Sequence, residues 1–329
     1  MKKLLNDPAR AVDESVEGFG LAHPDVVKVH TDPLFVTRAN PSPPGTVAIV
    51  SGGGAGHEPL HAGFVGEGML DAAVPGAVFT SPTPDQVAAA IEAVDNGGGV
   101  LAIVKNYTGD VLNFETAVEL TDGIEVSTVL VHDDVAVEDS LYTAGRRGVA
   151  GTVLVEKIAG AAAARGDDLA AVTAIAERVS SNVRSMGVAL FAPTVPHVGR
   201  PSFDLPDDEI EIGIGIHGEP GRHRIKAADA DTITTTLLDA VVEDLDLESG
   251  ESVLLFVNGM GGTPSSELYV VYRRARKLLE DRGVDVRRSL VGSYVTSLEM
   301  QGMSITVLRL DSELTSLWDA PVHTTALRW

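Results

Sequence analysis

The sequence of 329 residues contains no cysteine. This absence excludes disulfides, thiolate metal ligands and cysteine nucleophiles together. No uninterrupted apolar run approaches the roughly 18 residues that a membrane-spanning helix requires. The first residues, MKKLL, start like a signal peptide, but Asp7, Pro8, Arg10 and Asp13 interrupt that pattern at once. We therefore expect a cytoplasmic protein that has no membrane partner.

Positive charge is also scarce. The chain has 25 Lys and Arg residues against 47 Asp and Glu residues, which gives a net charge of −22. Nucleic-acid binding is not expected, because a phosphate backbone is bound by clustered Lys and Arg. The acidic residues are spread along the chain, as on the strongly hydrated surfaces of proteins from salt-loving organisms. We therefore hypothesise that folding depends on salt.

What the sequence does have is a regular alternation of short apolar runs and helical patterns, with 44% hydrophobic residues. The predicted strands are Thr46–Val50, Gly76–Phe79, Val100–Val104, Val126–Val131, Val188–Phe191, Glu209–Ile216, Ser252–Asn258, Val284–Arg288 and Ser304–Leu310. The predicted helices are Pro84–Val94, Asn113–Leu120, Val153–Ala164, Leu169–Met186, Asp231–Leu245, Ser265–Arg282 and Ser312–Trp318. This order predicts an α/β fold with two lobes, each a mixed or mostly parallel sheet flanked by helices.

The Pro- and Gly-rich segment 192–201 predicts a crossing between the lobes. We divide the chain near residue 187, into an N-terminal lobe (1–187) and a C-terminal lobe (188–329). Ligands of α/β sheets bind at the carboxyl ends of strands. Four segments follow predicted strands in this way: SGGGAGHEP and KNYTGD in the first lobe, and HGEPG and NGMGGTP in the second.

The segment SGGGAGHEPLH (51–61) resembles two familiar motifs. It is not a Walker A loop, because no lysine in the chain directly follows a glycine. It also spells H-E-x-x-H, but Pro59 separates His57 from His61, so one helix face cannot present both rings. We therefore predict no metal site and expect His61 to be an ordinary residue on the following helix. A literal G-x-G-x-x-G at 213–218 lies inside a predicted strand, which argues against a dinucleotide site.

Two histidines remain, His57 in GHEP and His217 in HGEP, each at a strand end with glycine neighbours. A neutral imidazole can act as a base or attack a carbonyl carbon. Lys105 and Asp110 flank the turn of KNYTGD. Asp110 is either a helix cap or an acceptor that orients a substrate hydroxyl. Lys105 is either a surface charge or a site residue that ends an apolar strand.

Longer motifs extend this pattern along the whole chain. They are SGGGAGHEPLHAGFVGEGML, PGAVFTSPTPDQ, VKNYTGDVLNFETA, DDVAVEDSLYTAGRRGVAGTVLVEKIAGAAAARG, EIGIGIHGEPG and SLWDAPVHTTAL. Together they resemble the dihydroxyacetone-binding subunit, subunit K, of dihydroxyacetone kinases. The resemblance implies two α/β lobes, a homodimer and a bound three-carbon ketone.

The resemblance also implies roles for individual residues. His217 would hold the ketone as a covalent hemiaminal, and His57 would act as acid or base together with Asp110. Gly54, Ala55, Gly56 and His57, with Lys105 and Asp110, would contact the substrate. Ala55 stands where the usual GGSGH sequence of the family has a serine, so any contact from that hydroxyl is lost.

The chain itself has no evident nucleotide or Mg²⁺ site, so we expect no cofactor in it. The resemblance implies that a subunit L carries ADP or ATP with Mg²⁺, and that a phosphotransferase protein, subunit M, recharges it indirectly from phosphoenolpyruvate. Two alternatives stay open. The chain could be a non-catalytic dihydroxyacetone sensor, or a kinase subunit for another short ketose such as erythrulose.

Overall fold

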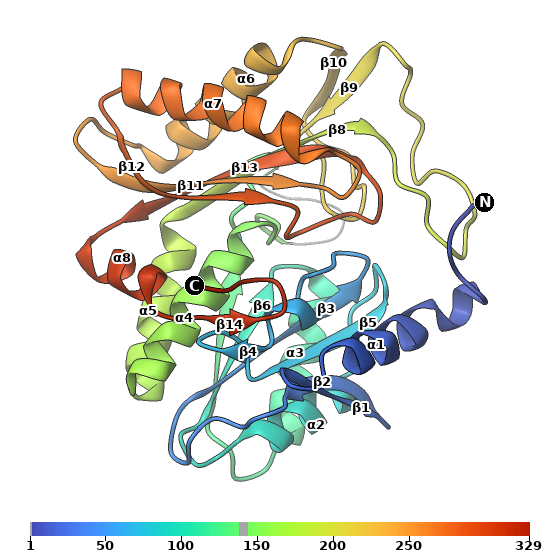
Figure 1. Cartoon of the computed structure of the whole chain (residues 1–329), viewed down its shortest axis with the longest axis vertical. Helices are drawn as coiled ribbons and strands as arrows, with labels where there is room; N and C mark the ends of the chain where they lie inside the picture. The colour runs from blue at the N-terminus through green and yellow to red at the C-terminus, as the bar shows by residue number, and fades with distance from the viewer. Residues whose placement is uncertain (1, 138–143) are drawn as a thin grey trace.

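The computed structural model describes residues 2–137 and 144–329. Residues 138–143, which belong to the motif at 133–166, lie outside the described part. Two six-stranded sheets lie one above the other with helices between them and on their outer faces (Figure 1). The predicted α/β fold with two sheet-containing lobes is therefore confirmed. No helix among the described residues is both long and apolar enough to cross a membrane.

The first sheet has the strand order β1-β2-β5-β3-β6-β7. Its strands are β1 Val27–Thr31, β2 Leu34–Arg38, β3 Ala48–Ala55, β5 Ala72–Val78, β6 Val100–Lys105 and β7 Val126–Val131. The four strands from β5 to β7 run parallel, whereas β1 and β2 are antiparallel. Because β5, β3 and β6 are parallel neighbours, the residues that follow them meet at one edge of the sheet.

The second sheet has the order β10-β9-β8-β13-β11-β12 and is mostly antiparallel. Its strands are β8 Val183–Phe191, β9 Glu209–Ile212, β10 His223–Lys226, β11 Ser252–Gly259, β12 Asp285–Gly292 and β13 Gln301–Leu310. A short pair, β4 Gly66–Glu67 with β14 His323–Thr324, ties the end of the chain to the first lobe.

Three helices, α4 Gly151–Arg165, α5 Leu169–Ser181 and α8 Ser312–Asp319, form the layer between the sheets. Helices α2 Pro84–Val94 and α3 Thr108–Leu120 cover the outer face of the first sheet, and α6 Ala230–Leu245 and α7 Ser265–Asp281 cover that of the second. The remaining helical segments are η1 Pro8–Arg10, α1 Ala11–Ala22 and η2 Ala62–Phe64. Every residue of α4 from 151 to 163 is buried, since both sheets and α5 surround it.

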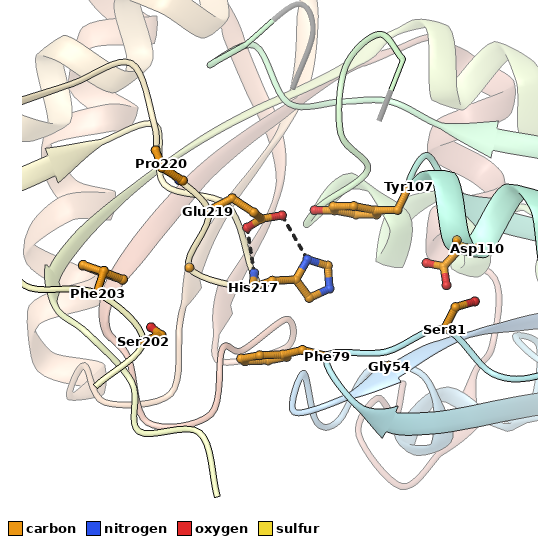
Figure 2. A pocket seen from close by; sticks show the side chains of 12 residues that line it. Gly54, Phe79, Ser81, Tyr107, Asp110, Ser202, Phe203, His217, Glu219 and Pro220 are labelled. Carbon is orange, nitrogen blue, oxygen red and sulfur yellow. Dashed lines mark hydrogen bonds and ion pairs between the residues drawn. The ribbon is translucent and has the colours of Figure 1, made fainter. Parts of the chain in front are cut away.

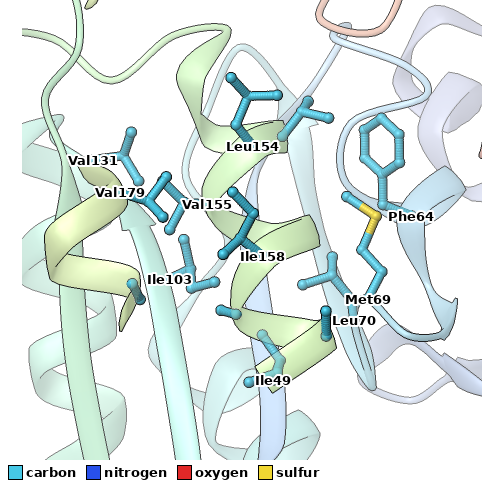
Figure 3. Close-up of a cluster of buried hydrophobic side chains, with 14 of the residues drawn as sticks. Ile49, Phe64, Met69, Leu70, Ile103, Val131, Leu154, Val155, Ile158 and Val179 are labelled. Carbon is cyan, nitrogen blue, oxygen red and sulfur yellow. The ribbon is translucent and has the colours of Figure 1, made fainter. Parts of the chain in front are cut away.

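The central core joins both sheets through α4. Figure 3 shows the part of it in which α4 packs against side chains of the first sheet and of α5. Strand alternation sorts the apolar side chains: Phe256 of β11 points into this core, while Leu255 and Val257 face α6 and α7. Gly160 allows α4 to approach the first lobe closely, because a Cβ there would lie 2.4 Å from the Cα of Met69. Small residues in α4 thus set the distance between the helix and its neighbours.

Several predicted boundaries were wrong. The helix predicted over Leu169–Met186 ends at Ser181, because β8 begins at Val183. The strand predicted over Glu209–Ile216 ends at Ile212, because Gly213 takes a left-handed φ of 80° that breaks the extended chain. The predicted division at residue 187 stays a prediction, although that residue lies inside β8 and residues 312–329 pack against the first lobe.

Candidate active site

A cavity of about 510 Å³ lies between the carboxyl end of the first sheet and the turn that follows β9 (Figure 2). Its volume is in the range of small-molecule sites. The lining residues come from both lobes: Gly54, Phe79, Ser81, Tyr107, Gly109, Asp110, Ser202, Phe203, His217, Gly218, Glu219 and Pro220. The cavity therefore lies where strand ends were expected to bring functional residues together.

His217 points into this cavity from the turn after β9 (Figure 2). Its Nδ1 lies 3.0 Å from Oε1 of Glu219, and its backbone N–H donates to Oε2 at 2.9 Å. An ionised carboxylate can only accept, so Nδ1 carries the proton and the lone pair remains on Nε2. The pair is held tightly, because a Cβ at Gly215 would lie 2.0 Å from Glu219 Oε2.

The charge of Glu219 is stable. Burial alone would raise the pKa of this carboxyl, but the charges of His217 and Arg147 outweigh burial and lower the pKa to about 2. Arg147 is itself wholly buried, pairs with Asp134 and donates to the carbonyl of Gly213. It thereby anchors the turn that carries His217. Glu219 therefore stays ionised throughout the neutral range and fixes the His217 tautomer.

His57 is wholly buried, and its ring lies 4.8 Å from the His217 ring, close to perpendicular. Its Nδ1 donates to the carbonyl of Thr296 at 2.7 Å, which joins the two lobes at the site. Its Nε2 is therefore an acceptor, and this buried atom has no hydrogen-bond partner among the described residues. Burial, followed by the charges of His217 and Lys105, holds the pKa of His57 well below its usual value. His57 is thus a neutral acceptor beside the cavity.

Two aromatic side chains that sequence reasoning missed enclose His217. The Tyr107 ring packs edge-on against it at 4.6 Å, and Phe79 does so at 5.4 Å while stacking on His57. Phe79 holds a left-handed φ of 57°, which a non-glycine residue adopts only under constraint. The hydroxyl of Tyr107 is buried without a partner among the described residues, and burial raises its pKa well above 10. It is therefore an O–H donor at neutral pH.

Asp110 lines the cavity from the first turn of α3. Its Oδ2 lies 3.8 Å from Nζ of Lys105, the last residue of β6. Lys105 is completely buried and does not line the cavity; its Nζ donates to the carbonyl of Gly52 at 3.1 Å. The surface-charge interpretation of Lys105 is thus wrong. Burial lowers its pKa, although Asp110 and Glu156 oppose that shift.

The glycines of SGGGAGH are largely part of β3 and not of a loop. They provide space: a Cβ at Gly53 would lie 2.3 Å from Lys105 Nζ, and one at Gly54 would lie 2.5 Å from the backbone of Thr80. Of the predicted substrate contacts, Gly54, Asp110 and His217 line the cavity. Ala55, Gly56, His57 and Lys105 lie behind that lining.

The prediction that His61 is an ordinary helical residue was wrong. It is buried just before η2, with Nδ1 2.6 Å from Oε1 of Glu156 and 3.0 Å from Oγ of Ser51. Its Nε2 lies 2.7 Å from Lys105 Nζ. Sequence reasoning could not find Glu156, which lies in the middle of a buried helix 95 residues away. Among residues 2–137 and 144–329, no group of three or more His, Asp or Glu side chains is arranged to hold a metal ion.

Comparisons with known proteins identify close relatives. A model of the Dak1 domain matches residues 17–326. The chain is 48% identical over 355 residues to the PEP-dependent dihydroxyacetone kinase, dihydroxyacetone-binding subunit DhaK of Escherichia coli, with 100% of this chain and 99% of the relative covered. It is 53% identical over 315 residues to the corresponding subunit of PTS-dependent dihydroxyacetone kinase 1 of Listeria innocua, with 95% of each chain covered.

Solved structures give the same picture. The dihydroxyacetone kinase operon co-activator Dha-DhaQ superposes with a TM-score of 0.89 at 34% identity, over 95% of this chain and 97% of that chain. The dihydroxyacetone kinase of C. freundii superposes with a TM-score of 0.87 at 35% identity, over 99% of this chain and 60% of that longer chain.

Proposed function

The chain belongs to the Dak1 domain family, and on that premise we propose that it is the dihydroxyacetone-binding subunit of a phosphotransferase-type dihydroxyacetone kinase. The relatives that carry this name are similar over 95% or more of both chains. The observation that carries the chemical proposal is the arrangement of His217, whose Nδ1 is held by Glu219 while its ring points into the cavity (Figure 2).

In the proposed binding step, Nε2 of His217 attacks the carbonyl carbon of dihydroxyacetone. A bond forms between Nε2 and that carbon, and the π electrons of the carbonyl move to its oxygen, which takes up a proton from solvent water. Glu219 stabilises the positive charge that develops on the ring, because its carboxylate lies 3.0 Å from Nδ1. The Tyr107 hydroxyl is a donor for the new oxygen. Glycerol has no carbonyl and cannot form this adduct.

The bound ketone then presents a terminal hydroxyl for phosphorylation. Asp110 lines the cavity and accepts the proton of this hydroxyl as its oxygen attacks phosphorus. His57 offers a second acceptor through Nε2, which is buried beside the His217 ring. Phosphoryl transfer otherwise depends on positioning and on neutralising the phosphate charge.

The phosphoryl donor is proposed to lie on a second protein. A nucleotide-carrying subunit L would bring ADP or ATP with Mg²⁺ to the mouth of the cavity, and a phosphotransferase protein would recharge the nucleotide. The chain itself would act as a homodimer in the cytoplasm.

Substitution of His217 tests the covalent step. In His217→Ala, we expect the mass of the added ketone to disappear from the intact-protein mass spectrum, and phosphorylation by the reconstituted complex to be lost. His223→Ala is a matched control, because His223 is an exposed residue of the same lobe on β10. An adduct of unchanged yield in His217→Ala would overturn the assignment, and kinase activity of this chain alone with ATP and Mg²⁺ would overturn the two-protein scheme.

One observation favours a second candidate, a dihydroxyacetone-responsive regulator: the dihydroxyacetone kinase operon co-activator Dha-DhaQ superposes with a TM-score of 0.89. A regulator needs the anchor His217 but not a proton acceptor such as Asp110. Reconstitution with subunit L and a panel of short ketoses, including erythrulose, separates the candidates. Formation of a ketose phosphate supports the kinase subunit; adduct formation without any phosphorylation supports the regulator.

A further inference from the structure

A chain of polar side chains leads from the cavity into the core between the sheets. It starts at Asp110 on the cavity wall and continues to Lys105 at 3.8 Å. From Lys105 Nζ it passes to His61 Nε2 at 2.7 Å, and from His61 Nδ1 to Glu156 Oε1 at 2.6 Å. All four side chains are buried, and Glu156 belongs to the central helix α4. The roles proposed above use only Asp110 directly.

The hydrogen atoms of this chain can be placed from a fifth residue. The Ser51 hydroxyl donates its proton to the carbonyl of Ile103 at 2.7 Å. Ser51 Oγ can therefore only accept from His61 Nδ1, which lies 3.0 Å away. Nδ1 of His61 then carries the ring proton and faces Glu156 as a donor. The other nitrogen, Nε2, has a free lone pair and accepts a proton of the Lys105 ammonium group.

We propose, on the basis of the kinase function proposed above, that Lys105, His61 and Glu156 form a proton relay that takes up the proton released by the substrate hydroxyl. Asp110 removes that proton as the hydroxyl oxygen bonds to phosphorus and the bond from phosphorus to the leaving nucleoside diphosphate of the partner-borne nucleotide breaks. Lys105 Nζ gives a proton to His61 Nε2 as Nδ1 of His61 gives its proton to Glu156, and Nζ then takes the proton from Asp110.

These transfers balance. Asp110 ends as a carboxylate and Lys105 as an ammonium group, as both began, and His61 is neutral before and after. The net changes are that Glu156 has become a neutral acid and that the ring proton of His61 has moved from Nδ1 to Nε2, so His61 has changed its tautomer. The same steps in reverse return the proton to the cavity after the product has left. The 3.8 Å gap between Lys105 and Asp110 shortens to a hydrogen bond in the reacting complex, as catalytic contacts of unliganded enzymes commonly do.

The electrostatics of the chain suit this role. Burial raises the pKa of Glu156 to about 8, so near this pH the carboxyl both takes up and releases a proton, and its ionised fraction is the one that can accept. Burial also lowers the pKa of Lys105. The pKa values of Lys105, which gives up a proton, and of Glu156, which accepts one, therefore lie closer together than they do in water. Burial and the charge of Lys105 hold the pKa of His61 well below its usual value, so the ring transfers protons without becoming doubly protonated.

The groups that face Glu156 are few. The first sheet presents Ser51 from β3 and Lys105 from β6, and the segment after β3 presents His61. The charged side chains Arg178 of α5 and Glu313 of α8 pair with each other near the surface. The second carboxylate oxygen, Oε2, has no hydrogen-bond partner among the described residues. A buried carboxyl with one unpartnered oxygen is costly to the fold, which argues that its chemistry is used.

The test compares variants of the chain in the reconstituted complex with its nucleotide-carrying partner. Glu156→Gln keeps the shape and an acceptor for Nδ1 but cannot take up a proton. We expect its kcat to fall roughly 100-fold, as for the loss of a general acid–base group, with KM for dihydroxyacetone unchanged. In the wild type, kcat rises with pH as Glu156 ionises near pH 8, because protonated Glu156 cannot accept; this rise is absent in Glu156→Gln.

Two further variants separate the relay from a structural effect. Glu156→Asp retains a carboxyl group and is expected to recover part of kcat together with the pH-dependent rise. Lys157→Met removes a neighbouring buried charge of α4, which donates to the carbonyl of Leu317, and is expected to leave kcat and its pH dependence as in the wild type. An unchanged kcat in Glu156→Gln, or loss of the pH-dependent rise in Lys157→Met, refutes the relay.

Infrared spectroscopy of the chain alone provides a readout that does not require kinase activity. A protonated Glu156 gives a carboxylic-acid carbonyl band below neutral pH that Glu156→Gln lacks. If the wild-type complex phosphorylates no ketose, the proposed function fails, and this band still decides whether Glu156 takes up a proton. Absence of the band in the wild type, or its persistence in Glu156→Gln, refutes the relay independently.

Discussion

The pairing of Glu219 with His217 leads to a quantitative prediction for Glu219→Gln. The wild-type carboxylate is 6% exposed and stays ionised because His217 and Arg147 lower its pKa from 4.5 to about 2. At about 1.4 kcal/mol for each pKa unit, this difference corresponds to about 3 kcal/mol, which is the net effect of burial, the charge and hydrogen bond of His217 and the charge of Arg147. A glutamine keeps the hydrogen-bond acceptor for Nδ1 but loses the charge.

The imidazole ring becomes positively charged when Nε2 bonds to the ketone, so this interaction stabilises the adduct more than the free protein. Because Arg147 accounts for part of this energy, we expect Glu219→Gln to reduce the equilibrium constant of adduct formation by about 10- to 100-fold. Titration calorimetry with dihydroxyacetone measures this constant. Glu211→Gln is a suitable control, because Glu211 is equally buried in the neighbouring strand and pairs with Arg224.

The same pKa predicts the pH dependence of the ion pair. The pKa of Glu219 is lower in the folded state than its ordinary value of 4.5. The pair therefore contributes its full stability above about pH 4.5 and loses it only as the pH falls through about 2. An equilibrium constant of adduct formation in Glu219→Gln within about threefold of wild type at neutral pH would refute the reasoning, because the carboxylate that faces the charged ring would then stabilise the adduct by less than about 1 kcal/mol.

Three further predictions concern the fold and its surface. Gly53→Ala places a Cβ 2.3 Å from Lys105 Nζ, so we expect it to disrupt the Lys105 contacts and lower the free energy of unfolding by about 1–3 kcal/mol. Gly18→Ala, which has open space around the new Cβ, is not expected to destabilise the fold. Urea titration measures both variants, and equal stability of the two would contradict the packing argument. Phe256→Ala opens a cavity in the central core and is expected to lower the unfolding free energy by about 3–5 kcal/mol, while Tyr269→Ala at an exposed position changes it little; a small loss for Phe256→Ala would show that this core is loosely packed. The net charge of −22 predicts that thermal stability rises from low salt to molar KCl as repulsion is screened, and melting curves that do not change with salt would count against a salt-adapted surface.

Of the four strand ends predicted to bind ligand, three contribute to the cavity and NGMGGTP does not line it. Gly54 and Asp110 lie at one edge of the first sheet because their strands are parallel neighbours, and His217 reaches them from the turn after β9 of the second sheet. The sequence also contained the signals for β1 and β2, since VKVHT alternates apolar and polar residues and LFVTR is rich in β-branched and aromatic ones, on either side of a turn at Asp32 and Pro33. These two strands were not predicted.

The contacts that decide chemistry were harder to predict. Glu219 could have been found, since it lies two residues from His217 in the same turn. Glu156 could not, because a glutamate in a helix ordinarily faces water, and only the packing of α4 between two sheets buries it against His61. The helix predicted over 169–186 was longer than the observed helix for a similar reason. Residues 183–186 continue the helical apolar pattern, and only pairing with β13 makes them a strand.

The most direct test of the account observes the carbonyl carbon of the substrate itself. Dihydroxyacetone labelled with ¹³C at the ketone carbon is mixed with the chain, and its ¹³C NMR spectrum is recorded. The account predicts that binding moves this resonance from the ketone region to that of a carbon with four single bonds, and that His217→Ala leaves it in the ketone region. A bound carbon that remains a ketone in the wild-type protein would contradict the central claim that Nε2 of His217 forms a covalent bond to the substrate.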